Sequence, residues 1–454
     1  MSLESRNPAT GELLASFEPH GQAAIEDRLG RAAAAFRSWK QTSFDERARL
    51  LDRVADLLES DRERLARLMT LEMGKLLRAA GDEIIKSARA CRFYAQHGAA
   101  FLADEDIATE AARSYIRYEP VGPVFAIMPW NFPFWQVFRF AAPALMAGNV
   151  ALLKHAPNVP QCALAIEALF QTAGAPDGVF QTLLIEVDQV PPILEDERVS
   201  AVTLTGSDRA GRDVASRAGR ALKKSVLELG GSDPFIVMPS ADVTTAVATA
   251  VKSRTLNSGQ SCIAAKRFVV SEAVADEFLH QFVAAMAALK IGDPLDAATD
   301  VGPMARADLV DALSAQVDDA VARGARVLTG GAPLSRAGHF YPPTVLVDIP
   351  TDARVYREEL FGPVASVFRV NDLDEAIALA NDTPYGLAAS VWTKDAAERD
   401  RFVDALEVGQ VFVNAMVASD PRVPFGGVKR SGYGRELGPH GIRELTQVKA
   451  VWVM

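Results

Sequence analysis

The sequence contains little that would tie it to a disulfide-stabilised or metal-binding protein. Its 454 residues include three cysteines, Cys91, Cys162 and Cys262, which lie far apart. This number and spacing exclude a disulfide framework and indicate a reducing compartment. The six histidines are also scattered, and neither an HExxH nor a CxxC motif is present, so we predict no metal site.

The sequence also lacks an excess of basic charge and a long apolar run. Lysine and arginine total 48 against 58 acidic residues, for a net charge of −10, so we expect no nucleic-acid partner. The most apolar stretch, 121–156, is interrupted by prolines, Arg139 and Lys154, whereas a membrane span needs about 20 mostly apolar residues. The N-terminus shows no apolar segment of a secretory signal. We therefore expect a soluble, cytoplasmic protein that does not bind membranes.

Apolar periodicity predicts an α/β protein. Residues 25–36 and 50–68 repeat with helical spacing, and from about residue 120 short apolar runs alternate with helical segments. These runs are 124–127, 150–153, 181–184, 201–204, 226–229, 235–238, 267–270, 364–368, 387–392 and 411–413. They are too many for one sheet of ordinary size. We predict two doubly wound, Rossmann-like α/β domains joined near residue 228.

Two β-prone segments, 114–118 and 448–452, fit no strand–helix–strand unit. An edge hairpin and a terminal strand of this kind could pair with another subunit. The alternative is that they cap a sheet of their own chain.

Two segments have the features of a dinucleotide site. Residues 201–211 are typical of a strand, a glycine turn at Gly206 and a helix, whose N-terminus would suit a pyrophosphate. Lys154 ends an apolar strand, where ligands of open α/β sheets bind. The alternatives are that Gly206 lies in an ordinary turn without a ligand and that Lys154 is a solvated surface residue.

Three side chains are candidates for catalysis. Cys262 lies in a loop between a helix ending near Leu256 and the next strand, where a substrate could reach a nucleophilic thiol. Glu228 ends an apolar strand, so burial would raise its pKa toward that of a general base. Asn131 lies in a rigid turn, 129–133, that could fix an oxyanion donor. Each of the three has an alternative interpretation. Cys262 could be a buried apolar thiol, as we interpret Cys91 and Cys162. Glu228 could be a capping or surface acid, and Asn131 could bond to its own backbone.

Together these motifs resemble those of the NAD(P)-dependent aldehyde dehydrogenase family. They occur in the family order over nearly the whole chain, and 34 residues separate Glu228 from Cys262, as the family pattern expects. The matching segments are 72–75, 129–133, 205–207, 228–231, 259–262, 358–363 and 424–427. Residues 130–149, 154–156 and 230–235 are, more narrowly, similar to those of bacterial succinate-semialdehyde dehydrogenases.

The resemblance implies a role for each of these residues. Cys262 would attack the aldehyde carbon, and Asn131 and the Cys262 backbone N–H would hold the oxyanion. After hydride transfer to the nicotinamide, Glu228 would activate water to hydrolyse the thioester. Residues implied at the cofactor are Trp130, Lys154, Ala156, Pro157, Gly206, Ser207, Leu229, Glu359 and Phe361.

The substrate is expected to be a short ω-carboxy aldehyde, succinate semialdehyde first. Arg139 lies among aromatic residues and would need an anion, either a substrate carboxylate or an acid of this chain. The resemblance places Ser419 near that carboxylate, Trp135 and Phe425 along the tunnel, and Ser261 beside the nucleophile. Glutarate semialdehyde, an aliphatic aldehyde, a CoA-acylating reaction and a non-enzymatic binding protein are the alternatives. Glu228 argues against acylation of CoA, because a base that activates water would be counterproductive there.

The cofactor is expected to be NAD or NADP, with a slight preference for NAD. No acid or arginine closely follows Lys154, and Pro157 cannot donate to a 2′-phosphate. We expect residues 1–102 and 120–228 to form the cofactor-binding domain and 229–435 the catalytic domain. Segments 103–119 and 436–454 would mediate a homodimer or homotetramer.

Overall fold

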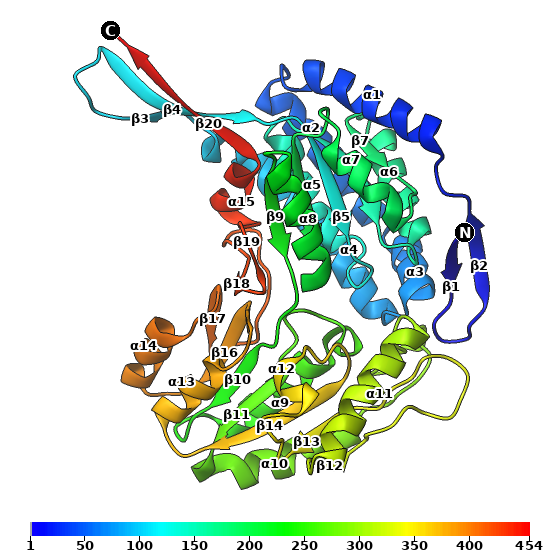
Figure 1. Ribbon diagram of the computed structural model, residues 1–454, viewed down its shortest axis with the longest axis vertical. Helices are drawn as coiled ribbons and strands as arrows, with labels where there is room; N and C mark the ends of the chain where they lie inside the picture. Colours follow the sequence, from blue (N-terminus) through cyan, green and yellow to red (C-terminus); the bar gives the residue numbers. More distant parts are fainter. Residues whose placement is uncertain (1) are drawn as a thin grey trace.

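A mainly parallel sheet forms the centre of each of two lobes in the computed structural model, which describes residues 2–454 (Figure 1). A three-stranded antiparallel arm extends from the first lobe. This arrangement confirms the predicted pair of doubly wound α/β domains with a separate β element.

The first lobe is built on a six-stranded sheet whose strands, apart from the short edge strand β19, run parallel. In sheet order they are β19 (Gly432–Tyr433), β9 (Lys224–Glu228), β8 (Ala201–Thr205), β5 (Pro123–Met128), β6 (Val150–His155) and β7 (Phe180–Thr182). Every residue of β6 and β8 is buried, as expected where helices cover both faces of a parallel sheet. The helices are α1 (Gln22–Trp39), α2 (Phe44–Ser60), α3 (Arg62–Met73), α4 (Leu77–Phe101), α5 (Trp135–Met146), α6 (Pro160–Thr172), α7 (Val190–Glu195) and α8 (Asp208–Arg220), with the 3-10 turn η1 (Val187–Gln189).

The second lobe contains a seven-stranded sheet with one antiparallel edge strand, β12. Its strands, in sheet order, are β12 (Arg326–Thr329), β13 (Thr344–Val347), β14 (Val364–Val370), β11 (Arg267–Ser271), β10 (Pro234–Val237), β16 (Ala388–Trp392) and β17 (Gln410–Val413). The helices are α9 (Val243–Thr255), η2 (Leu256–Gly259), α10 (Glu272–Ala287), α11 (Ala307–Ala322), α12 (Arg354–Arg357), α13 (Leu373–Asn381) and α14 (Ala396–Ala405). The chain passes from the first lobe to the second between β9, which ends at Glu228, and β10, which begins at Pro234.

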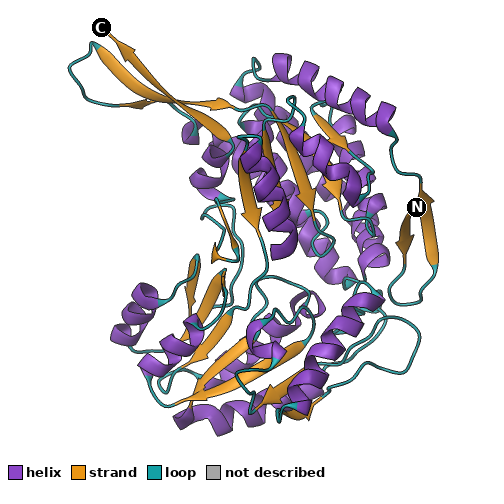
Figure 2. Cartoon of the chain, in the orientation of Figure 1, coloured by secondary structure: helices purple, strands orange, loops and turns teal. Residues whose placement is uncertain are grey.

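The arm consists of β3 (Glu105–Asp106), β4 (Arg113–Pro120) and β20 (Thr446–Val453). β20 pairs along the whole of β4, so the two β-prone segments of the sequence pair with each other. In Figure 2 the arm extends away from the helices of the first lobe. Not all of 436–454 belongs to the arm, because α15 (Gly438–Glu444) packs against α4 and α5.

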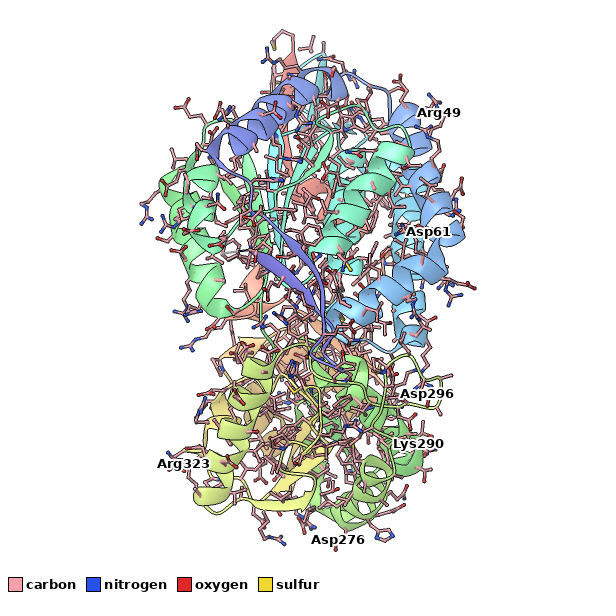
Figure 3. The ribbon with its side chains drawn as sticks, turned by 90° about the vertical axis from the view of Figure 1, so that its right-hand side faces the viewer. Arg49, Asp61, Asp276, Lys290, Asp296 and Arg323 are labelled. Carbon is pink, nitrogen blue, oxygen red and sulfur yellow. The ribbon has the colours of Figure 1, made fainter. Side chains whose placement is uncertain are left out.

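Two small antiparallel pairs complete the fold. The hairpin of β1 (Leu3–Arg6) and β2 (Leu13–Phe17) reaches the junction of the lobes, where the His339 N–H donates to the Pro8 carbonyl at 3.0 Å. Figure 3 shows this hairpin from the side, with the labelled Asp61 on the first lobe and Asp276 on the second. The other pair is β15 (Tyr385–Gly386) with β18 (Val428–Lys429).

No helix between residues 2 and 454 is both long and apolar enough to cross a bilayer. In the same described range, no group of three His, Cys, Asp or Glu side chains could hold a metal ion.

Candidate active site

The loop that carries Cys262 turns through three consecutive left-handed residues. Asn257, Ser258 and Gly259 have φ angles of 54°, 55° and 79°. A Cβ atom on Gly259 would lie 2.2 Å from the carbonyl carbon of Gly362, so no other residue fits here without moving one backbone away from the other. This turn brings the chain from the end of α9 into the junction between the lobes.

Hydrogen bonds from buried side chains hold the backbone of this loop. Arg254 donates to the Gly259 carbonyl at 2.7 Å, and the Gln260 side chain accepts the Ala305 N–H at 2.8 Å. The Lys266 ammonium donates to the carbonyls of Ser261 at 2.7 Å and Cys262 at 2.6 Å. The Cys262 sulfur is therefore carried by a backbone whose carbonyl groups at Gly259, Ser261 and Cys262 are held in place.

The Cys262 side chain lines a cavity of about 320 Å³. Burial raises the pKa of its thiol to about 12, although the positive charges of Lys266 and Arg139 act in the opposite direction. In contrast to Cys91 and Cys162, which are fully buried, Cys262 is partly exposed. The thiol is thus protonated in the free protein and must lose its proton when it reacts.

Asn131 is brought directly to the nucleophile loop. Its side-chain Nδ2 donates to the Gln260 carbonyl at 3.0 Å, and its own carbonyl accepts from the Asn257 amide at 2.8 Å. One N–H of the Asn131 amide remains for another acceptor. The structure thus places the predicted oxyanion donor next to the backbone that leads into Cys262.

A buried glutamate holds the start of α5, just after Asn131. The Glu83 carboxylate accepts the N–H groups of Phe134 at 2.9 Å and Trp135 at 3.0 Å, where the positive end of the helix dipole favours an anion. Lys75 forms an ion pair with Glu83 and lies 3.8 Å from the centre of the Phe132 ring. This pair fixes the segment that carries Asn131.

A second buried glutamate, Glu72, holds the start of α6. It accepts the N–H groups of Gln161 at 2.8 Å and Cys162 at 2.9 Å. At the end of β6, the neutral His155 ring connects the Ala156 N–H with the Pro133 carbonyl, both at 2.9 Å. These positioning roles were not predicted, although segment 72–75 was among the family motifs.

Glu228 ends β9 with its carboxylate buried. In the part of the chain that the structure describes, neither of its oxygens has a hydrogen-bond partner. Burial raises the pKa of Glu228 well above its usual value, and the nearby Glu436 raises it further. A Cβ on Gly426 would lie 2.7 Å from Glu228 Oε1. Glu228 is not among the residues that line the Cys262 cavity, so its carboxylate would have to turn to act there.

Arg139 has a partner within the chain. Its guanidinium forms an ion pair with Glu436, donates to Thr205 Oγ1 at 3.2 Å and lies 4.6 Å from the centre of the Phe425 ring. Of the two alternatives stated for Arg139, the structure contains the internal ion pair. The side chain nevertheless lines the Cys262 cavity.

All the residues predicted at the substrate lie around that single cavity. They are Trp135, Arg139, Ser261, Ser419 and Phe425, together with Cys262. Sequence reasoning missed Lys86 in α4, which also lines the cavity and whose ammonium donates to Ser419 Oγ at 2.7 Å. Nothing in the sequence marks Lys86, because it is one of many charged residues in the first four helices.

A second cavity, of about 500 Å³, lies at the end of β6 and contains part of the predicted cofactor site. It is lined by Lys154, Pro157 and Asn158 with residues 185–188 and 2–4. Burial lowers the pKa of Lys154 to about 8, and its ammonium forms no ion pair with an acid of residues 2–454. The buried side-chain amide of Asn158 has no partner within the same range. These unmatched polar groups fit the adenosine ribose of a dinucleotide. Ala156 is buried in the core of the first lobe.

The remaining predicted cofactor residues lie along the junction of the lobes. Trp130 meets Phe361 edge-on with ring centres 5.8 Å apart, and Leu229 is buried against Gly211. Ser207 caps α8 by accepting the Ala210 N–H at 3.3 Å, directly after Gly206. Glu359, predicted at the nicotinamide ribose, accepts the Gly231 N–H at 3.1 Å and pairs with Lys266 at 3.2 Å.

The chain is similar to known proteins over its whole length. The model of the aldehyde dehydrogenase family matches residues 1–451. The chain is 54% identical to succinate-semialdehyde dehydrogenase [NADP(+)] 1 of Mycobacterium tuberculosis over 456 residues, covering all of both chains. It is 52% identical to a probable succinate-semialdehyde dehydrogenase [NADP(+)] of Synechocystis, again over the full length of both.

A solved structure is similar over the whole fold. The succinic semialdehyde dehydrogenase of Streptococcus pyogenes, in complex with NADP+ as the cofactor, superposes with a TM-score of 0.97 at 35% identity, covering 99% of each chain. The names of these relatives favour NADP, so they do not support the preference for NAD expected from the sequence.

Proposed function

Because the chain belongs to the aldehyde dehydrogenase family, we propose that it oxidises succinate semialdehyde to succinate with NADP+ as its preferred cofactor. The observation that carries this proposal is the Cys262 cavity, in which a thiol, aromatic walls and buried cationic side chains occur together. An aldehyde with a carboxylate at its other end has the complementary charge. The names of the full-length relatives support the same substrate.

The residues of the site account for the steps of the reaction. The Cys262 thiol loses its proton to solvent as the sulfur attacks the aldehyde carbon, and the free N–H of Asn131 and the Cys262 backbone N–H donate to the oxyanion that forms. A dinucleotide held by residues such as Lys154, Glu359 and Phe361 would supply the oxidising chemistry, as the hydride acceptor. Glu228, once ionised and turned toward the resulting thioester, takes a proton from the attacking water and passes it to the departing sulfur, which releases the acid and the free thiol.

The preference for NADP+ rests on the cavity at the end of β6. Lys154 is buried there without an acidic partner, and the Asn158 amide carries unused donors. A 2′-phosphate would receive hydrogen bonds from both groups, although the side chains of Glu4, Glu186 and Asp188 also line this cavity. NAD was expected because Pro157 cannot donate to a 2′-phosphate, and that reasoning assigned no role to the Asn158 amide.

A steady-state comparison tests the proposed function. We expect kcat/KM for succinate semialdehyde to exceed that for butanal, its neutral counterpart, by at least about tenfold, and NADP+ to be used better than NAD+. Equal values for the two aldehydes would overturn the substrate. Analysis of the products with and without CoA separates hydrolysis from acylation, and we expect free succinate in both cases.

We also propose that the chain forms a homo-oligomer through its arm. Val448 is 61% exposed and Trp452 is 51% exposed on β20, in contrast to the buried apolar residues of the lobes. An apolar strand face of this kind is typical of a contact with another chain.

A further inference from the structure

We propose that Lys266 is a positioning residue for the nucleophile. Its buried ammonium holds the Cys262 loop and supplies the positive charge that favours the thiolate, while Glu359 competes for that charge. This inference rests on the proposed function only for the role of Cys262 as the nucleophile. Neither the identity of the aldehyde nor that of the dinucleotide enters it.

Lys266 is fixed at the point where the central strand β11 begins. Its backbone N–H donates to the Asp233 carbonyl at 3.1 Å, and its own carbonyl accepts the Ser366 N–H at 2.9 Å. These two bonds hold it between β10 and β14, the neighbours of β11 in the sheet. The side chain is 1% exposed, so its ammonium has little freedom to leave the nucleophile loop.

The Lys266 ammonium meets three acceptors, which matches its charged form. It donates to the carbonyls of Ser261 at 2.7 Å and Cys262 at 2.6 Å, and it pairs with Glu359 at 3.2 Å. An ammonium has three N–H groups and no lone pair, whereas a neutral amine would turn a lone pair toward one of these oxygens. Burial lowers the pKa of Lys266, but the negative charges of Glu359 and Asp233 raise it.

Lys266 is the cation that acts most strongly on the Cys262 thiol. Burial raises the pKa of this thiol, and among the nearby charges Lys266 opposes the rise most, followed by Arg139. Glu359 and Asp233 act against the two cations and raise the pKa of the thiol further. Loss of the Lys266 charge would therefore leave the thiol facing two acids with one cation.

The other charged groups around Cys262 are held by different contacts. Arg139 forms a buried ion pair with Glu436 in the first lobe, and Arg254 donates to the Gly259 carbonyl, three residues before the sulfur. The remaining charged residues that line the Cys262 cavity are Lys75, Asp82, Glu83, Lys86 and Lys252. Lys266 differs from all of these because it donates to the carbonyl of the nucleophile itself.

Glu359 shares the Lys266 charge with the nucleophile loop. The oxygen of Glu359 that pairs with Lys266 also accepts the Gly231 N–H at 3.1 Å. Glu359 is 17% exposed, so it is the member of the pair that solvent reaches. Removal of its negative charge should leave more of the field of Lys266 to act on the thiol.

The test measures alkylation of Cys262 by iodoacetamide in the full-length protein, because the thiolate is the form that reacts. Peptide mass spectrometry from pH 7 to pH 10 follows Cys262 separately from the buried Cys91 and Cys162. In Lys266→Met we expect the rate at a given pH to fall by at least about fivefold. In Glu359→Gln it should change in the opposite direction and rise by at least about twofold.

Lys266→Gln separates the charge from the hydrogen bonds, because an amide keeps two N–H donors without the positive charge. We expect Cys262 in this variant to react as slowly as in Lys266→Met, within about twofold. Thermal unfolding shows which variants are folded, and Lys266→Gln carries the test if Lys266→Met is not. The matched control is Lys252→Met, which removes the same charge from an exposed residue lining the same cavity and should keep the wild-type rate.

Each outcome decides one part of the proposal. Wild-type rates in both variants of Lys266 would overturn it, and a wild-type rate in Lys266→Gln alone would show that the hydrogen bonds act without the charge. A slower reaction in Glu359→Gln would overturn the competition by Glu359. Alkylation requires neither substrate nor cofactor, so the expected rates in a protein without preference for succinate semialdehyde would refute the proposed function and leave this inference standing.

Discussion

At the scale of single residues, burial decides which protonation state each reactive group adopts. Lys86 is an example, because the pKa of its ammonium is lowered to about 8, chiefly by burial and also by the charge of Arg139, while Glu83 and Asp420 oppose the change. The positive charge of Lys75 also lowers the pKa of Lys86. The charge of Lys86 is therefore present at neutral pH and is lost a little above it.

This titration leads to a prediction for binding of the product. The Lys86 ammonium lines the Cys262 cavity, where its charge would attract succinate, so inhibition by succinate should weaken above about pH 8, by up to about tenfold per pH unit. Inhibition constants against butanal, measured from pH 6 to 9.5, provide the check. Lys86→Met should bind succinate weakly at every pH, and a wild-type profile without an inflection would contradict the account.

Glu228 leads to a second prediction at this scale. Glu228→Gln removes the base that activates water but leaves the thiol and the oxyanion donors in place. We expect a burst of NADPH of about one equivalent per site, followed by a steady rate roughly 10²-fold or more below that of wild type. Stopped-flow absorbance records both phases. A steady rate equal to that of wild type would remove Glu228 from hydrolysis.

The residues of the site were predictable to different degrees. Cys262, Glu228 and Asn131 stand in short motifs whose spacing is visible in the sequence. The ion pair of Arg139 with Glu436 could be stated only as an alternative, because its partner comes from a segment almost 300 residues away. Lys86 could not be singled out, since its importance depends on burial that only packing of the whole chain creates.

At the scale of elements, the turn before Cys262 is the most constrained part of the site. Gly259→Ala would place a Cβ 2.2 Å from the Gly362 carbonyl carbon at a φ of 79°, so we expect a loss of more than about 1 kcal/mol of stability and of most activity. Thermal unfolding and turnover measure both effects.

The matched control for this substitution is Gly30→Ala, in the exposed middle of α1, where a Cβ meets nothing within 4 Å. Alanine is the better helix former, so this variant should gain about 0.5–1 kcal/mol and keep full activity. Equal behaviour of the two variants would show that the turn tolerates side chains.

The elements themselves were predicted best where apolar runs are long. Short apolar runs predicted the strands of the first-lobe sheet other than β19, and they also predicted β10, β11, β14, β16 and β17 in the second lobe. The short strand β13 was missed because it follows Pro342 and Pro343, which are typical of a loop. The hairpin of β1 and β2 was missed because its strands are short and partly exposed.

At the scale of the whole molecule, the arm leads to a prediction about assembly. Val448→Asp combined with Trp452→Asp places charges on an exposed apolar strand face, so we expect the oligomer to dissociate. Light scattering coupled to gel filtration measures the mass. Val403→Asp, at a 50% exposed residue of α14, is the control and should leave the mass unchanged. A double variant with the mass of wild type would show that the arm does not join subunits.

The central claim is that the two lobes bring an aldehyde to the Cys262 sulfur beside a bound dinucleotide. Its most direct test is peptide mass spectrometry of Glu228→Gln quenched after a single turnover with succinate semialdehyde and NADP+. The account predicts a succinyl group on the peptide that contains Cys262 and none on the peptides with Cys91 or Cys162. NADPH formation with an unmodified Cys262, or a succinyl group on another cysteine, would contradict it.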